Sequence, residues 1–159
     1  MMLKKAPLEL CDLDLNDSVR ETIAFFSSVA VARGVDLKSS VAAIPLRING
    51  DRVHLQQVIV NLIMNAMDAM SAVPENQRKL AIATARVDRF AELYVADTGP
   101  GIPADKLKEI FDPFFSTKKS GMGMGLSIAR TLVEAHGGKL WAENKMNGGA
   151  VFHVKLPLV

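Results

Sequence analysis

The stretch over residues 51–70, DRVHLQQVIVNLIMNAMDAM, constrains the fold of this chain more than any other. Read at helical spacing, its polar side chains form one stripe with steps of three and four residues: His54, Gln57, Asn61, Asn65 and Asp68. The other positions are nearly all apolar, which predicts a helix buried around most of its circumference. Asn is a poor helix former because its amide competes for backbone hydrogen bonds. Two Asn residues one turn apart therefore indicate amides that bind a ligand, and the alternative is a solvated stripe on a core helix.

The composition is that of a single soluble domain with an aliphatic core. The 159 residues suffice to bury such a core, and 49% of them are hydrophobic. A formal charge of +2 is too small to indicate nucleic acid or an anionic membrane as a partner. The single cysteine, Cys11, excludes an internal disulfide and a cysteine-based zinc site, and three scattered histidines do not predict a metal site. No apolar run is long enough to span a bilayer, and the N-terminus has no signal-peptide pattern.

Hydrophobic periodicity predicts three main helices and a sheet of about five strands. Asn16 is the expected cap of the first helix, which ends at Gly34, and the second helix opens at Asp51. The third helix is expected over about 124–135, and a short helix over 104–110. The expected strands cover 8–10, 35–41, 46–49, 80–87, 90–96, 139–143 and 151–156. This pattern predicts an α/β fold, a two-layer α/β sandwich in which three helices cover one face of a mixed sheet.

The segment DTGPGIP at 97–103 follows an apolar strand and is expected to turn sharply; we call it the 97–103 corner. Gly99 and Gly101 allow the backbone to approach a ligand closely. The Asp97 carboxylate beside them can accept a hydrogen bond from an amino group such as the exocyclic amine of adenine. The alternative is an ordinary Asp-Thr-Gly turn.

The segment GMGMGL at 121–126 places three glycines at alternate positions directly before a helix. Free backbone amides and the positive end of a helix dipole form an anion site, and the alternative is a flexible hinge. The segment matches neither a Walker A loop nor a dinucleotide-binding loop. Between it and the corner lies FDPFFSTKKSG, at 111–121, whose phenylalanines are expected in the core. Its Lys118 and Lys119 could close on phosphates, or form an exposed basic loop.

In this order, the Asn-rich helix, DTGPGIP, FDPFFSTK and GMGMGL resemble the N, G1, F and G2 boxes of sensor histidine kinases. These kinases share the GHKL ATPase superfamily and its Bergerat fold with gyrase, Hsp90 and MutL. The similarity extends from about Gly50 to the C-terminal LPL. It implies one ATP-binding catalytic domain over 1–159, with a tail at 1–7 and an ATP lid at about 111–123. The implied cofactors are ATP and Mg²⁺, and the implied process is two-component signal transduction.

The resemblance also assigns roles to residues. Asn65 matches the family's Mg²⁺ ligand, and an amide oxygen suits this hard cation. Asp97 matches the aspartate that reads adenine, and Asn61 and Lys118 are the implied catalytic residues. The implied nucleotide-binding set is Asn61, Asn65, Asp68, Asp97, Gly99, Gly101, Ile102, Phe111, Thr117, Lys118, Gly121, Met122, Gly123, Met124, Gly125 and Leu126. Val151 departs from the family, which often has Thr at this place near the adenine pocket.

Position 61 separates two branches of the superfamily. In the gyrase, Hsp90 and MutL relatives a glutamate stands four residues before the Mg²⁺-binding Asn and activates water. Here that place holds Asn61, whose amide cannot act as a carboxylate base. Phosphoryl transfer is therefore favoured over fast hydrolysis. The alternatives are a hydrolytic ATPase and a nucleotide-gated interaction module without transfer activity.

None of the histidines resembles a phosphoacceptor. His54 lies at the start of the long helix, His136 is expected to cap the third helix, and His153 is expected on the wet face of the last strand. We therefore expect a catalytic domain that acts on a histidine of a separate dimerisation domain in its parent kinase, with a response regulator downstream. The fragment is expected to be monomeric and cytoplasmic, without nucleic-acid or direct membrane contact, even where its parent is membrane-anchored.

Overall fold

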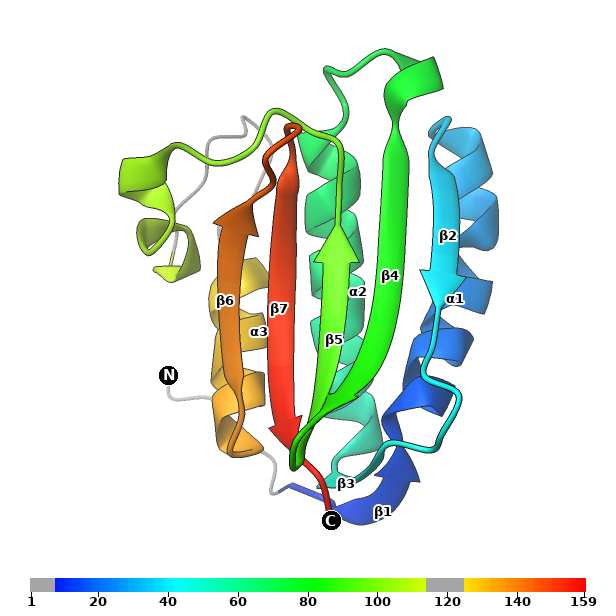
Figure 1. Cartoon of the computed structure of the whole chain (residues 1–159), viewed down its shortest axis with the longest axis vertical. Coiled ribbons are helices and arrows are strands. Elements are labelled where there is room, and N and C mark those ends of the chain that lie inside the picture. Colours follow the sequence, from blue (N-terminus) through cyan, green and yellow to red (C-terminus); the bar gives the residue numbers. More distant parts are fainter. Residues whose placement is uncertain (1–7, 114–124) are drawn as a thin grey trace, which may run out of the picture.

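The computed structural model describes residues 8–113 and 125–159, and in this part of the chain helices and strands form two layers (Figure 1). The α-helices are α1 (Leu15–Ala32), α2 (Arg52–Ala69) and α3 (Gly125–Ala135), and the 3₁₀ turns are η1 (Glu75–Gln77), η2 (Ala104–Lys106) and η3 (Glu109–Phe111). The strands are β1 (Cys11–Asp14), β2 (Asp36–Ser40), β3 (Arg47–Gly50), β4 (Lys79–Val87), β5 (Phe90–Ala96), β6 (Lys139–Asn144) and β7 (Ala150–Pro157). Among the described helices, none is both long and apolar enough to span a bilayer.

Five strands form one mixed sheet in the order β2-β4-β5-β7-β6. β2 runs parallel to β4, and all other neighbours in this sheet are antiparallel. β1 and β3 form a separate antiparallel pair at the end of the domain where α2 begins. The three helices lie behind the five-stranded sheet in Figure 1 and cover one of its faces. The predicted two-layer sandwich with a five-stranded mixed sheet is therefore confirmed.

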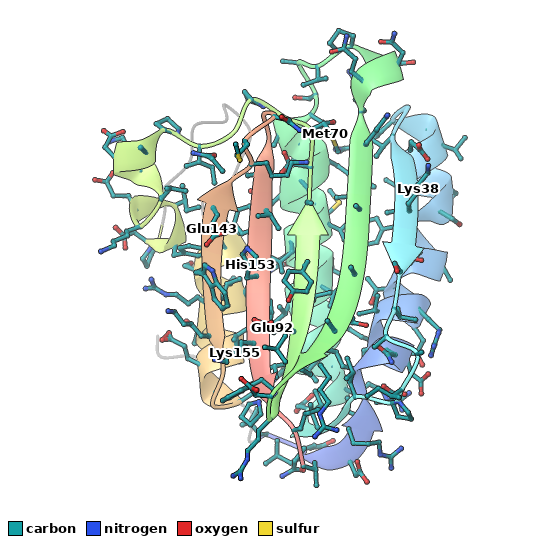
Figure 2. All side chains as sticks on the ribbon, viewed as in Figure 1. Lys38, Met70, Glu92, Glu143, His153 and Lys155 are labelled. Atoms are coloured by element: carbon teal, nitrogen blue, oxygen red, sulfur yellow. The ribbon has the colours of Figure 1, made fainter. Side chains whose placement is uncertain are left out.

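The hydrophobic core lies between the helices and the covered face of the sheet. Alternate side chains of the strands point inward, as in β7, where Phe152 and Val154 are each 1% exposed. From the other layer, α2 contributes Leu62 and Ile63, which are fully buried. The intervening strand residues point to the open face, where Figure 2 shows Glu92, Glu143, His153 and Lys155. The sheet thus separates an apolar interior from a polar outer face.

The start of α1 differs from the prediction. The cap is Asp14, whose Oδ1 accepts hydrogen bonds from the N–H of Asn16 (2.9 Å) and the N–H of Leu46 (3.0 Å). Asn16 lies inside the first turn and is 1% exposed. Its amide donates to the carbonyl of Ile44 (2.9 Å) and accepts from the Thr84 hydroxyl (2.6 Å). Asp and Asn are comparable caps, so the contacts of Asn16 with distant residues decide between them.

Three further elements differ from their predicted bounds. The first strand covers 11–14 instead of 8–10, because residues 11–14 are the ones that pair with β3. The short helix expected over 104–110 is split into η2 and η3. Neither turn has a side-chain cap hydrogen bond, and a segment this short forms few helical hydrogen bonds. The strand predicted at 35–41 is shorter in the structure, where it forms β2.

Candidate nucleotide site

The polar stripe of α2 begins at its cap. Asp51 Oδ1 accepts a hydrogen bond from the N–H of His54 (3.1 Å), and Oδ2 accepts one from the N–H of Glu9 (3.0 Å). These bonds stabilise the ionised carboxyl and lower the pKa of Asp51. The N–H of Asp51 donates to Nε2 of His136 (3.0 Å), whose Nδ1 donates to the carbonyl of Leu132 (2.7 Å). His136 therefore bonds within the last turn of α3, as predicted, and also joins α3 to the start of α2.

Further along the stripe, Asn61 connects α2 to the beginning of α3. Its Oδ1 accepts from Nε2 of Gln57 (2.5 Å), and its Nδ2 donates to the carbonyl of Gly125 (2.9 Å). Gly125 is the first residue of α3, where the segment expected to wrap the phosphates ends. Asn61 is thus a positioned amide at the edge of the predicted phosphate site, although the 114–124 segment itself lies outside the described residues.

Asn65 and Asp68 follow on the same stripe with different environments. Within residues 8–113 and 125–159, no hydrogen bond of the half-buried Asn65 side chain is recorded, which leaves its amide oxygen for a ligand. Asp68 Oδ1 forms an ion pair with Nη1 of Arg33 (3.0 Å), at the end of α1. The pairing ties α2 to α1, and the sequence stripe alone did not indicate Arg33. The nucleotide-binding role of Asp68 stays a prediction.

Asp97 is a buried carboxylate at the end of β5. It is 1% exposed, and its Oδ1 accepts hydrogen bonds from the N–H of Gly99 (2.8 Å) and the N–H of Ala150 (3.3 Å). No hydrogen bond to Oδ2 is recorded in the described part of the chain, so this oxygen remains for a donor of a ligand. Burial raises the pKa of Asp97, and the two backbone hydrogen bonds and the charge of Lys145 oppose that shift.

The glycines after Asp97 are required by close contacts. A Cβ at Gly99 would lie 2.9 Å from the carbonyl oxygen of Ala69, at the end of α2. Gly101 has a φ of +82°, which L side chains rarely adopt. Thr98, which directly precedes Gly99, donates to the carbonyl of Gln77 (2.6 Å) and accepts from the N–H of Lys79 (2.9 Å). The predicted corner therefore lies against the last turn of α2, on the same helix as the Asn residues.

Several predicted site residues serve the core or lie outside the description. Phe111 is 4% exposed and meets the Phe152 ring edge-on, with 6.1 Å between centroids. Ile102 and Leu126 are partly buried and pack against the core. Gly125 has open space where a Cβ would lie. The remaining predicted residues, Thr117, Lys118, Gly121, Met122, Gly123 and Met124, lie outside the described residues.

Two residues that contact the 97–103 corner were missed by sequence reasoning. Asn144, at the end of β6, forms hydrogen bonds to both backbone groups of Ile102. Gly149 has a φ of +89°, and a Cβ there would overlap the carbonyl of Asp97. The double glycine at 148–149 indicated a hairpin turn, but neither composition nor spacing indicated that this turn contacts the 97–103 corner.

The other two histidines lie away from this corner. His54 is partly exposed, with Nδ1 3.7 Å from Asp51 Oδ2. His153 was predicted on a wet face, and it does lie on the open face of the sheet, but its side chain is only 14% exposed. It stacks on Trp141 with 4.9 Å between centroids and meets Tyr94 edge-on. Neighbouring aromatic rings on β5 and β6 therefore cover it.

Comparison with known proteins identifies the family. The family model for histidine kinase-, DNA gyrase B- and HSP90-like ATPases matches residues 50–159. The chain belongs to this family. Within it, the sensor histidine kinase TmoS of Ectopseudomonas mendocina is 40% identical over 98% of this chain and 16% of its own length. The sensor protein FixL of Bradyrhizobium diazoefficiens is 40% identical over 90% of the chain and 28% of its own length.

Solved structures of this ATPase family agree. The catalytic domain of the histidine kinase ThkA superposes with a TM-score of 0.84 at 36% identity, covering 94% of this chain and 96% of that domain. Full-length ShkA in complex with AMPPNP superposes with a TM-score of 0.83 at 26% identity, over 98% of this chain and 32% of ShkA. The resemblance predicted from the boxes is confirmed: this is a histidine-kinase-type ATPase domain. The chain spans less than a third of the curated sensor kinases TmoS and FixL.

Proposed function

We propose that this domain binds Mg-ATP and transfers the γ-phosphoryl group to a histidine on a separate dimerisation domain, with a response regulator downstream. The observation that carries the proposal is the Asp97 carboxylate, which uses Oδ1 for two backbone N–H groups and keeps Oδ2 for a ligand. An adenine amine is a donor of the required kind. ThkA, which resembles this chain, has been solved in complex with the response regulator TrrA, and this supports the same class of partner here.

A magnesium ion fits the donors on α2. Among the described residues, no group of three His, Cys, Asp or Glu side chains could hold a metal, which disfavours a site built only from protein ligands. Mg²⁺ commonly keeps several waters and takes one or two protein ligands together with substrate phosphates. The uncommitted amide oxygen of Asn65 suits that role. The bound ion would neutralise charge on the phosphates.

The residues of this chain contribute positioning to the transfer. Asn61 holds the start of α3 through the carbonyl of Gly125, and Asp97 orients the base at the other end of the site. Asn61 is an amide engaged at both ends, by Gln57 and by Gly125, so it cannot take a proton from water. Transfer to an outside acceptor is therefore favoured over hydrolysis, which is the alternative function.

The test uses γ-labelled Mg-ATP, the purified chain and the histidine-bearing dimerisation domain of a related sensor kinase. We expect nucleotide binding, little free phosphate, and label on the acceptor domain in an acid-labile, base-stable form. The Asn65→Ala variant should lose Mg²⁺-dependent binding. The matched control is Gln56→Ala, which removes an amide of the same helix that contacts Glu21 on α1. Rapid phosphate release without acceptor labelling would replace the kinase proposal with a hydrolytic ATPase.

A further inference from the structure

The side-chain amide of Asn144 forms hydrogen bonds to both backbone groups of Ile102. Its Oδ1 accepts from the N–H of Ile102 (2.7 Å), and its Nδ2 donates to the carbonyl of Ile102 (2.6 Å). One side chain thus serves both polar groups of a residue 42 positions earlier in the chain, as a neighbouring strand would do. Asn144 is the last residue of β6, an edge strand of the main sheet. The two hydrogen bonds therefore join the sheet to the 97–103 corner.

The corner and the amide also fit each other sterically. A Cβ on Gly101 would lie 2.9 Å from Asn144 Oδ1, closer than real Cβ contacts. The backbone at position 101 therefore passes directly over the amide. A side chain there would have to displace the group that holds the next residue.

The same hairpin that carries Asn144 also fixes Asp97. Asn144 pairs in register with Ala150, and the N–H of Ala150 donates to Asp97 Oδ1. Gly149, in the turn between β6 and β7, lies against the carbonyl of Asp97. One rigid unit of the sheet thus sets the positions of the carboxylate and of the corner that follows it.

We propose that Asn144 is a positioning residue for base recognition. Its amide holds the Gly99–Ile102 corner at a fixed distance from the Asp97 carboxylate, so that the backbone of the corner forms one wall of the base pocket. Two points then anchor the corner: Gly99 on Asp97 Oδ1 and Ile102 on Asn144. The inference rests on the proposed nucleotide binding and adds to it a residue that determines selectivity for the base.

The first test measures Kd for Mg-ATP and Mg-GTP with wild type and Asn144→Ala. We expect the Kd for Mg-ATP to rise about tenfold, since two hydrogen bonds at a partly solvated site are lost, and the preference for ATP over GTP to narrow. Asn144→Asp keeps an acceptor but loses the amide donor. Its Kd for Mg-ATP should therefore recover no more than half of the loss caused by Asn144→Ala. The matched control is Asn147→Ala, an exposed amide in the same hairpin for which no hydrogen bond is recorded among the described residues.

The second test uses the steric fit. Gly101→Ala and Gly148→Ala both place alanine at a positive φ, but only position 101 meets Asn144, and position 148 has open space. Gly101→Ala should therefore weaken ATP binding more than Gly148→Ala. In an Asn144→Ala background this extra loss should shrink, because Oδ1 is gone.

The outcomes separate this inference from the proposed function. A residue that only stabilised the fold would lower the midpoint of urea unfolding and leave the ATP-to-GTP ratio of Kd values unchanged. If wild type binds Mg-ATP and Asn144→Ala binds both nucleotides within twofold of wild type, the inference is overturned and the proposed function stands. If wild type binds neither nucleotide, both are overturned.

Discussion

Replacing Asp97 by Asn removes the negative charge and turns one hydrogen-bond acceptor in the base pocket into a donor, while the shape of the side chain is kept. In the folded protein Oδ1 accepts from the N–H of Gly99 and the N–H of Ala150, and an Asn oxygen can keep both bonds. The amide nitrogen then takes the place of Oδ2. Because an amide nitrogen is a donor, it would face the amino group of the base with another donor. We expect ATP binding to weaken without loss of the fold.

The size of the effect on binding follows from the lost hydrogen bond. A hydrogen bond to a charged group contributes about 1.5–3 kcal/mol. Its loss should therefore raise the Kd for Mg-ATP roughly ten- to hundredfold at neutral pH. The effect on the phosphate end of the site should be small, because Asn61 and Asn65 lie on a different element, α2.

Asp97→Asn should weaken ATP binding but gain stability relative to wild type at neutral pH. Burial raises the pKa of Asp97 above its value in the unfolded chain, which is about 3.9. A group with a raised folded-state pKa contributes stability that is present below the unfolded value and is lost as pH rises through the folded value. Asn does not titrate, so the free energy of unfolding of Asp97→Asn should gain on wild type as pH rises above about 4.

Two measurements test this reasoning. Calorimetric titration gives Kd for Mg-ATP, and urea unfolding at acid and neutral pH gives stability. Asp36→Asn serves as the control, because Asp36 is an exposed carboxylate on β2, at the opposite edge of the sheet from β6. An unchanged Kd would show that Asp97 does not read the base. If Asp97→Asn is less stable than wild type by more than about 2 kcal/mol at neutral pH, the carboxylate is structural. A loss of that size is typical of a buried polar group that is left without its hydrogen-bond partner.

Three further predictions concern stability. Asn16→Ala should lower the free energy of unfolding by about 3 kcal/mol in urea, since it leaves the Thr84 hydroxyl and the carbonyl of Ile44 without their buried partner. Burial and the hydrogen bond to Glu92 raise the pKa of Tyr94 to about 12. Stability should therefore fall between about pH 10 and pH 12, and because Tyr94 is the single tyrosine, the absorbance of tyrosinate reports its titration directly; Tyr94→Phe should lose this part of the fall. Gly138→Ala should destabilise by about 2 kcal/mol or more, because its Cβ would overlap the carbonyl of Lys155, whereas Gly125→Ala should leave stability nearly unchanged.

Elements with strong local patterns could be predicted from the sequence. α2 begins directly after Asp51, close to the expected start, because β3 ends at Gly50 and the Asp51 carboxylate caps the helix. The last strand was correctly expected to turn His153 to the open face, and its neighbours Phe152 and Val154 lie in the core. Both features are encoded within a few neighbouring residues, where periodicity and capping act directly.

Contacts between distant segments could not be predicted in the same way. Asn144 is exposed and is the last residue of a short strand, so nothing in its neighbourhood distinguishes it from a solvated Asn. Its importance comes from Ile102, and that pairing depends on how the β6–β7 hairpin meets the corner after β5. Asn16 shows the same limit, because its local position suits a cap while its partners lie near residues 42–44 and 84.

Val151, which departs from the family pattern, shows how the alternation of side chains along a strand determines which residue can reach a site. Side chains of β7 alternate between faces, and Ala150 and Phe152 are buried while Val151 between them is half-exposed. Val151 therefore points to the same face as His153, away from the covered side on which Phe152 lies. The residue beside the Asp97 carboxylate is Ala150, through its backbone N–H. A hydroxyl introduced at 151 would face the open sheet, whereas one at 150 would enter the covered side. Ala150→Ser should accordingly change the Kd for Mg-ATP, and Val151→Thr should leave it within about twofold of wild type, a difference of roughly 0.4 kcal/mol; a larger effect of Val151→Thr would contradict the assignment of faces.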